Sequence, residues 1–404
     1  MDLPRLPIGE RIRYYRNKRG RTQVAIAGLV GITEAYLSQI ERGLKVPSAD
    51  VIARIATELA VPVAALLTDE PSTPDPSSPT SAASGVVRAL MGHGTPYGTE
   101  PASPSALRKR VDAVWRIWQT SPARFTEVEA VLPSLITDLE YAVRAYRADD
   151  ETDARREVLR ASADLYGLLR SYCRRTGRLD LSLVAADRAR HAAEDADDPV
   201  RIAAAQWNLG QVLLSQGKER AAEAEDVATS AIESLRRAPA SLETTAMRGA
   251  LELVVALSAA RTRRRWQARQ HLEEQAAPLA APVGDECNVQ WTVFGPTNVA
   301  LHMISLDTLA GEASEALRTA DQIDTSRLPS RERQFTFGLE VARCYDLRRE
   351  DAAVLVHLQS LEELAPEDLE RSLVARQMTT ALVRRVRPTY RRQATALAQR
   401  LDLL

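Results

Sequence analysis

The stretch that most constrains this chain is Thr22–Gly43, which reads as two short helices joined by a tight turn. Thr22 and Thr33 are placed to cap the two helices, and Gly31 stands where the chain must turn through a left-handed conformation. The second helix has its apolar residues at helical spacing, at Tyr36, Leu37 and Ile40. Its other residues are small or polar: Glu34, Ala35, Ser38 and Gln39. A helix that buries one side and offers short polar groups on the other suits a DNA major groove.

The neighbouring segments complete a small helical domain. The pattern predicts a first helix over residues 8–18, a fourth helix that Ser48 caps, and a short fifth helix from Pro62 to Leu67. The apolar contacts expected of the helix after Thr22 are Val24, Ala25 and Leu29. Those expected of the fourth helix are Val51, Ile52, Ile55, Ala56 and Leu59. About sixty residues in five helices can bury one small core.

Residues 8–67 resemble the Cro/C1-type (Xre) helix-turn-helix family of phage and bacterial repressors. The matching motifs, in chain order, are Arg16-x-x-Arg19-Gly20-x-Thr22-Gln23, Ile32-Thr33-x-x-Tyr36-Leu37-Ser38-Gln39-Ile40-Glu41-Arg42-Gly43, Pro47-Ser48 and Ile55-Ala56-x-x-Leu59. The resemblance implies that the domain binds an operator as a homodimer. It also implies an internal salt bridge between Arg16 and Glu41, which would hold the fold and not read sequence.

The DNA-binding residues that the resemblance implies are Thr22, Gln23, Thr33, Glu34, Ala35, Ser38, Gln39, Arg42 and Lys45. Gln23, Arg42 and Lys45 would touch the phosphate backbone, and the positions from Thr33 to Gln39 would face the bases. Glu34 is repelled by DNA unless it accepts a hydrogen bond from a cytosine amino group, and Ala35 offers only an apolar contact. Ser38 and Gln39 are therefore the best candidates for direct base reading.

Charge and composition set the wider frame. The 404 residues carry a formal net charge of −1, are 45% hydrophobic and only 5% aromatic, which favours long helices. Residues 1–67 hold ten Lys or Arg and six Asp or Glu, a local net charge of +4 that suits phosphate contact.

The three cysteines, Cys173, Cys287 and Cys344, are far apart, and we expect them to be buried structural thiols rather than a redox sensor. No secretory signal or membrane span is visible, so a cytoplasmic protein is expected.

Residues 68–106 are rich in Pro, Ser and Thr and predict an extended linker, with a turn or two of helix at Val86–Met91. From residue 107 to residue 404 the chain reads as helical throughout. A leading helix pair is expected over 107–148, with Val111, Val114, Trp115 and Trp118 on one face.

A repeat is detectable in this helical part. Trp207-Asn208-Leu209-Gly210, followed by Gly217 and Ala222, has the spacing of a tetratricopeptide hairpin. Weaker copies keep the step of five residues from turn to small residue: Gly177 to Ser182, Arg263 to Ala268, Gly311 to Ala316 and Arg348 to Ala353. The predicted fold class is all-α, with a five-helix Cro/C1-type domain joined by the linker to a tetratricopeptide-like solenoid. This architecture resembles ligand-responsive regulators, including peptide-pheromone receptors, and a group of actinobacterial Xre-family regulators.

In such arrays the first helix of each hairpin lines the concave face, so a small-molecule or peptide effector would meet those helices. The candidate ligand contacts are Trp207, Gln211, Trp291, Phe294, Asn298 and Ser305. The alternatives are ordinary packing for Trp207 and helix capping for Asn298. The run Arg261–Arg265 either binds an acidic group or forms a solvated turn, of which the turn is preferred.

No motif specifies catalysis: the chain has no phosphate-cradling Gly loop with Lys-Ser/Thr, no Gly-x-Ser-x-Gly and no His-Glu-x-x-His. We therefore expect a protein that is not an enzyme and uses no cofactor or metal. Two hypotheses remain open. The first is a sequence-specific regulator, dimeric on a palindromic operator, whose helical domain senses an effector. The second is a DNA-tethered adaptor whose helical domain recruits a partner protein.

Overall fold

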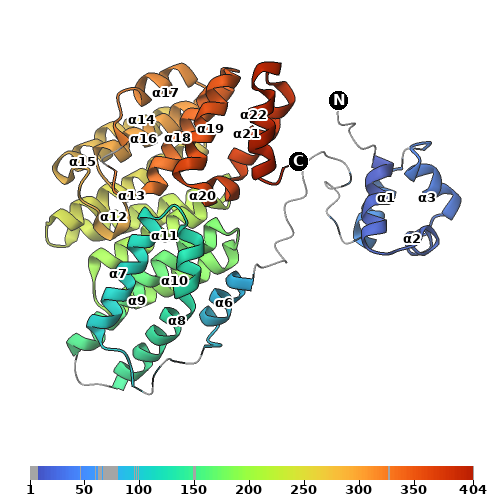
Figure 1. Ribbon diagram of the computed structural model, residues 1–404. Coiled ribbons are helices and arrows are strands. Elements are labelled where there is room, and N and C mark those ends of the chain that lie inside the picture. Colours follow the sequence, from blue (N-terminus) through green and yellow to red (C-terminus); the bar gives the residue numbers. More distant parts are fainter. Residues whose placement is uncertain are drawn as a thin grey trace. The chain divides into compact units, whose positions relative to one another are not determined.

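The computed structural model describes residues 8–45, 47–59, 61, 66, 81–94, 96, 98, 100–148, 152–325 and 328–403. Within these residues the chain is helical, with turns and loops but no strand, which confirms the predicted all-α class. The chain divides into two compact units, Met1–Ser78 and Pro79–Leu404 (Figure 1), which we call the head and the helical unit. Among the helices of these described ranges, none combines the length and apolarity needed to cross a bilayer.

The head contains the predicted pair of short helices. Its described helices are α1 (Ile8–Lys18), α2 (Gln23–Val30), α3 (Glu34–Glu41) and α4 (Ala49–Glu58). The hydroxyl oxygens of Thr22 and Thr33 each accept a backbone N–H at 3.2 Å, from Ala25 and Tyr36 respectively, and so cap α2 and α3. Gly31 ends α2 with φ 70°, the left-handed conformation that glycine adopts at low cost. The predicted caps and turn are confirmed.

The core of the head agrees with the apolar faces predicted for α3 and α4 and differs from the one predicted for α2. Ile12 of α1, Leu37 and Ile40 of α3, and the five expected residues of α4 are buried. In α2, however, Val24 is 61% exposed and Leu29 55% exposed, so the expected apolar contacts were wrong. The buried side of α2 is Ile26, Ala27 and Val30. The sequence of α2 is apolar almost throughout, so no polar residue marks which side faces outward. Of the predicted fifth helix, Leu66 is described and fully buried, and Pro62 and Leu67 lie outside the described residues.

The helical unit is a succession of helices, most of which pack against the next in the chain. They are α6 (Ser81–Leu90), α7 (Pro104–Thr120), α8 (Arg124–Ala145), α9 (Thr152–Arg175), α10 (Leu179–Asp195), α11 (Pro199–Ser215), α12 (Ala221–Arg237), α13 (Leu242–Arg261), α14 (Arg265–His271), α15 (Ala277–Val283), α16 (Pro296–Ala310), α17 (Ala313–Ala320), α18 (Arg331–Leu347), α19 (Asp351–Leu364), α20 (Pro366–Arg371), α21 (Leu373–Arg385) and α22 (Pro388–Arg400). Sequential packing of helix pairs is the arrangement of an α-solenoid.

The five predicted hairpin turns all fall between consecutive helices. Each contains a residue with positive φ: Gly177, Gly217, Arg263, Gly311 and Arg349. The small residue after the turn is fully buried at Ser182, Ala268 and Ala316. In the best-matching copy Ala222 is exposed instead, and its neighbour Ala221 takes the buried place. Gly210 allows α11 to approach α13, because a Cβ at this position would lie 2.9 Å from a methyl group of Val254.

The helical unit begins earlier than the composition predicts. Helix α6 packs against α8, with Val86, Ala89 and Leu90 buried in the same core as the side chains of α7. Residues 81–106 of the predicted linker therefore belong to the helical unit, and residues 68–80 lie outside the described residues. The composition does not predict that this helix joins the core, because its apolar stretch is short and lies among Pro and Ser residues. The stretch is buried by packing against α8, which is distant in the sequence.

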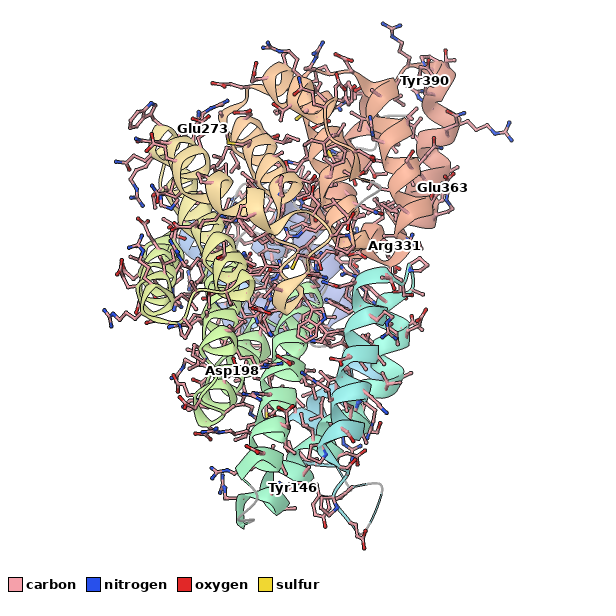
Figure 2. The ribbon with its side chains drawn as sticks, turned by 90° about the vertical axis from the view of Figure 1, so that its left-hand side faces the viewer. Tyr146, Asp198, Glu273, Arg331, Glu363 and Tyr390 are labelled. Carbon is pink, nitrogen blue, oxygen red and sulfur yellow. The ribbon has the colours of Figure 1, made fainter. Side chains whose placement is uncertain are left out.

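The array curves back so that its C-terminal helices touch its first helix pair. The Arg331 Nε donates to the Thr120 carbonyl at 2.9 Å, and Figure 2 places Arg331 at the junction of these two parts. The backbone N–H of Phe125 donates to a Glu367 carboxylate oxygen at 2.7 Å. Contacts between residues more than two hundred positions apart therefore join the end of α7 to α18 and the start of α8 to α20.

Candidate functional site

Helix α3 presents the surface expected to face DNA. Leu37 and Ile40 anchor it in the core, whereas Glu34 and Ala35 on the other side are exposed. Ser38 and Gln39 are half-buried, with polar groups at the edge of the same surface. The helix thus combines a fixed apolar side with short polar groups, which is the requirement for direct readout in a major groove. That these residues contact bases remains a prediction.

A buried network behind α3 holds the head together. The Arg16 Nε donates to Glu41 Oε1 at 2.6 Å and its Nη2 donates to Oε2 at 2.9 Å, with both residues buried. This confirms the salt bridge that the family resemblance implies. The hydrogen bond to Glu41 raises the pKa of Arg16 above its ordinary value. A second group also reaches this carboxylate, since Gln23 Nε2 donates to Glu41 Oε2 at 2.7 Å.

The remaining residues assigned to DNA have roles within the head as well. The Gln23 amide nitrogen keeps one further N–H for a phosphate. Arg42 and Lys45 are exposed; the Arg42 Nε donates to the Ser38 carbonyl at 3.2 Å, and Lys45 Nζ lies 5.5 Å from the centre of the Tyr36 ring. The hydroxyl oxygens of Thr22 and Thr33 already accept capping bonds, so both residues act first on helix geometry.

In the helical unit, the structure separates the candidate ligand residues into two groups. Phe294 is 1% exposed and lies against Gly249, where an added Cβ would come within 1.9 Å of the ring. It is a core residue, so the expectation that it walls a ligand pocket was wrong. Trp291 is half-buried and stacks on Trp115 with ring centres 4.5 Å apart, and its contact with a ligand remains a prediction. Trp291 and Phe294 both lie in the segment between α15 and α16, outside the regular α-helices, so helical periodicity does not predict where their side chains pack.

The other candidates lie on α11 and α16. Trp207 is buried and its ring lies 5.4 Å from the guanidinium of Arg170. Gln211 and Ser305 are half-buried. Asn298 is 1% exposed, its Nδ2 lies 3.5 Å from the Thr292 carbonyl, and its Oδ1 is buried without a hydrogen-bond partner among the described residues. Their ligand contacts remain predictions.

Sequence reasoning missed the most unusual cluster of the helical unit. Five arginines, Arg124, Arg170, Arg174, Arg175 and Arg333, gather with the carboxylates of Glu332 and Asp368. We call these five residues the arginine cluster. The one local signal was the spacing of Arg170 and Arg174, which places both on one side of α9. Arg175 is the last residue of α9, whereas Arg124 and Arg333 come from α8 and α18, which no local pattern connects to α9.

The run Arg261–Arg265 behaves as a turn. Arg263 adopts φ 64°, Arg264 pairs with Glu225, and Arg265 donates to the Leu309 carbonyl at 3.2 Å.

The thiol of Cys173 is buried, and burial raises its pKa to about 12, so it stays protonated. Among the described residues, no group of His, Cys, Asp and Glu side chains is arranged to hold a metal ion.

Comparison with known proteins identifies the family of the head. Residues 12–66 match the family model described as helix-turn-helix. The chain is 36% identical over 67 residues to the transcriptional regulator ClgR of Mycobacterium tuberculosis and, over a stretch of the same length, to the regulator SinR of Bacillus licheniformis. These matches cover 17% and 16% of this chain and 60% of each relative, so the chain spans less than two thirds of their length.

A shorter relative is matched more completely. The uncharacterized HTH-type transcriptional regulator YazB of Bacillus subtilis is 42% identical over 53 residues, which are 13% of this chain and 77% of that protein. The head is thus a helix-turn-helix domain of the kind found in bacterial regulators. The chain belongs to the family of HTH-type transcriptional regulators.

A solved structure with similar extent is that of Bacillus thuringiensis PlcR in complex with the peptide PapR7 and DNA. It covers 88% of this chain and 99% of its own, at 12% identity and a TM-score of 0.25. A TM-score this low does not establish a shared fold.

Proposed function

We propose that this protein is a sequence-specific DNA-binding transcriptional regulator whose helical unit senses a small molecule or peptide. The observation that carries the proposal is the geometry of α3, anchored by Leu37 and Ile40 and exposing polar groups on its other side. Family membership supports it, because the head is the part of the chain that its regulator relatives share. The local charge of +4 over residues 1–67 favours phosphate contact.

We further propose that the protein binds a palindromic operator as a homodimer. One head offers α3 alone as a reading surface, and a helix of eight residues spans only a few base pairs. Two heads on one face of the duplex would read two half-sites and multiply their selectivity.

The proposal is tested by selecting tight binders for the full-length protein from a random duplex library and footprinting the best sequence. We expect two symmetric half-sites about one helical turn, or a multiple of it, apart, and a steep loss of affinity with salt. A matched control is Glu58→Gln, at the exposed end of α4, which should select the same sequence. Selection of no preferred sequence would contradict the proposal and favour the adaptor hypothesis, in which the helical unit recruits a protein partner.

A further inference from the structure

The carboxylates of the arginine cluster are already occupied. Glu332 accepts from Arg124 at 3.0 Å and from Arg175, and Asp368 accepts from Arg124 and lies 3.6 Å from Arg175. These bonds join α8 and α9 to α18 and α20, where the array curves back. Burial alone would raise the pKa of Glu332, but the neighbouring arginines lower it well below its usual range, so it is ionised. Two carboxylates therefore compensate two arginines.

Three arginines remain without a carboxylate partner in the described part of the chain. Arg170 is 3% exposed, and its only hydrogen-bond acceptor among the residues that the structure describes is the neutral side-chain oxygen of Asn208. The Nε atoms of Arg170 and Arg174 are buried and have no hydrogen-bond partner within the described ranges. No ion pair or hydrogen bond joins Arg174 or Arg333 to another described side chain or carbonyl. A buried guanidinium without a counter-charge is costly, so this excess needs an explanation.

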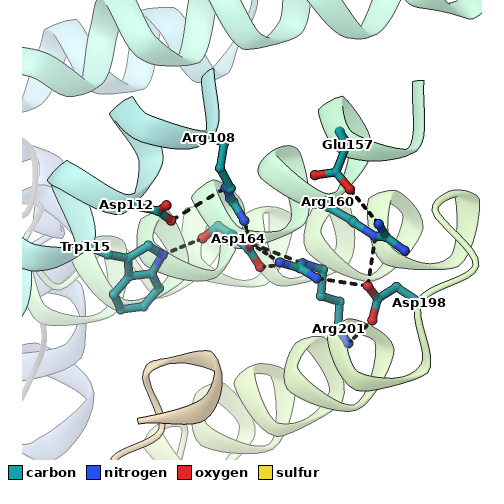
Figure 3. A network of polar contacts seen from close by, with 8 residues as sticks. All are labelled: Arg108, Asp112, Trp115, Glu157, Arg160, Asp164, Asp198 and Arg201. Atoms are coloured by element: carbon teal, nitrogen blue, oxygen red, sulfur yellow. Dashed lines mark hydrogen bonds and ion pairs between the residues drawn. The ribbon is translucent and has the colours of Figure 1, made fainter. Parts of the chain in front are cut away.

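The same helix shows how the protein treats buried charge elsewhere. Figure 3 shows Asp164, on an earlier turn of α9, held by Arg108 and by Arg201, whose Nη2 lies 2.9 Å away. Arg201 also reaches Asp198 at 2.9 Å, and Asp198 accepts from Arg160 at 3.0 Å. In this network every arginine has a carboxylate. Arg170, Arg174 and Arg333 lie outside this network, at the C-terminal end of α9 and the start of α18.

The three arginines repel one another electrostatically. Burial, together with Arg174, Arg175 and Arg333, lowers the pKa of Arg170 well below its usual range, against the opposing effect of the Glu332 carboxylate. Burial and Arg175 lower the pKa of Arg174 to about 9. An anion placed among them would relieve this repulsion. Arg174 and Arg333 are half-buried, so part of each residue faces solvent, and the Trp207 ring lies 5.4 Å from the guanidinium of Arg170.

We propose that Arg170, Arg174 and Arg333 form a binding site for an anionic group, a carboxylate or a phosphate, carried by a small ligand. Guanidinium groups suit both, because their N–H donors form paired hydrogen bonds to planar and tetrahedral oxyanions. The proposal rests on the proposed function in one respect: it names the chemical class of the effector that the helical unit senses.

The test is calorimetric titration of the full-length protein, without DNA, with inorganic phosphate and with succinate at constant ionic strength. We expect saturable binding of at least one anion. Arg174→Gln and, separately, Arg333→Gln should weaken it by about ten-fold or more, since each removes charge-assisted hydrogen bonds. The matched control is Arg178→Gln, one turn further along the chain, where the arginine pairs with Asp180 at the surface.

The outcomes distinguish a phosphate ligand from a carboxylate ligand, and they distinguish failure of the anion site from failure of the proposed function. Binding of phosphate alone assigns a phosphate ester, and binding of succinate alone assigns a carboxylate. No saturable binding, or equal binding by wild type and both variants, overturns the site. Because DNA is absent from the titration, a protein that binds the anion but selects no DNA sequence would retain the site and lose the proposed regulatory function.

Discussion

The head and the helical unit both bury arginine, but they compensate its charge differently. In the head, Arg16 has one carboxylate, Glu41, and meets it with two hydrogen bonds. In the helical unit, five arginines gather near Glu332 and Asp368, and these two carboxylates form ion pairs with Arg124 and Arg175. In a matched pair, the attraction between the two charges offsets the free-energy cost of burying them. The pair also fixes the relative positions of the two helices that carry it, which is a structural role. An unmatched cluster lowers stability unless something else supplies the missing charge, so the difference separates a scaffold from a binding site.

The largest expected effect breaks the matched pair. Arg16→Met leaves the Glu41 carboxylate buried without its main partner, and we expect a loss of about 3–5 kcal/mol in the free energy of unfolding of the head. Urea denaturation of the full-length protein, followed by circular dichroism, measures this loss. The double variant Arg16→Met/Glu41→Leu should recover much of the stability. A single variant as stable as wild type would mean that the pair does not hold the head together.

A smaller effect comes from lowering the pH, and we assign it to a histidine of the helical unit, since residues 1–78 contain no histidine. Burial, together with the nearby charge of Arg333, lowers the pKa of His302 from 6.5 to about 4. Between these values the unfolded chain binds a proton that the folded chain does not. Stability should therefore fall as the pH drops from about 6.5 to about 4, by up to about 3 kcal/mol.

Thermal unfolding across this pH range measures the effect, with His302→Gln expected to remove its share. The matched control is His191→Gln, on the exposed side of α10, which should leave the pH dependence unchanged. Equal pH dependence in wild type and His302→Gln would show that the imidazole is not held neutral by its surroundings.

The smallest effect concerns the unmatched cluster and has the opposite sign from the first. Arg174→Gln removes a half-buried charge that has no carboxylate partner among the described residues, so the ligand-free protein should be as stable as wild type or about 1 kcal/mol more stable. Thermal unfolding in chloride buffer measures this. A loss of stability comparable to that of Arg16→Met would make Arg174 a structural residue and remove the contrast between the two regions.

The sequence predicted those features of the fold that depend on a few neighbouring residues. The caps at Thr22 and Thr33, the turn at Gly31 and the positive-φ hairpin turns each depend on a few adjacent residues. The buried side of α2 was missed because an almost wholly apolar helix carries no periodic signal. The inward placement of Phe294 and the arginine cluster were missed because they depend on contacts between segments far apart in the chain. The positions of Arg16 and Glu41 were predicted by family resemblance, and their geometry confirms it.

The most direct test of the central proposal is the ratio of DNA affinities for the selected operator and a scrambled duplex, measured by fluorescence anisotropy. We predict that Ser38→Ala/Gln39→Ala reduces this ratio by about ten-fold or more, since each lost base contact costs about 1–3 kcal/mol of discrimination. Arg42→Ala should instead weaken both affinities and leave the ratio near that of wild type. An unchanged ratio in the folded Ser38→Ala/Gln39→Ala protein would contradict the assignment of α3 as the helix that reads DNA.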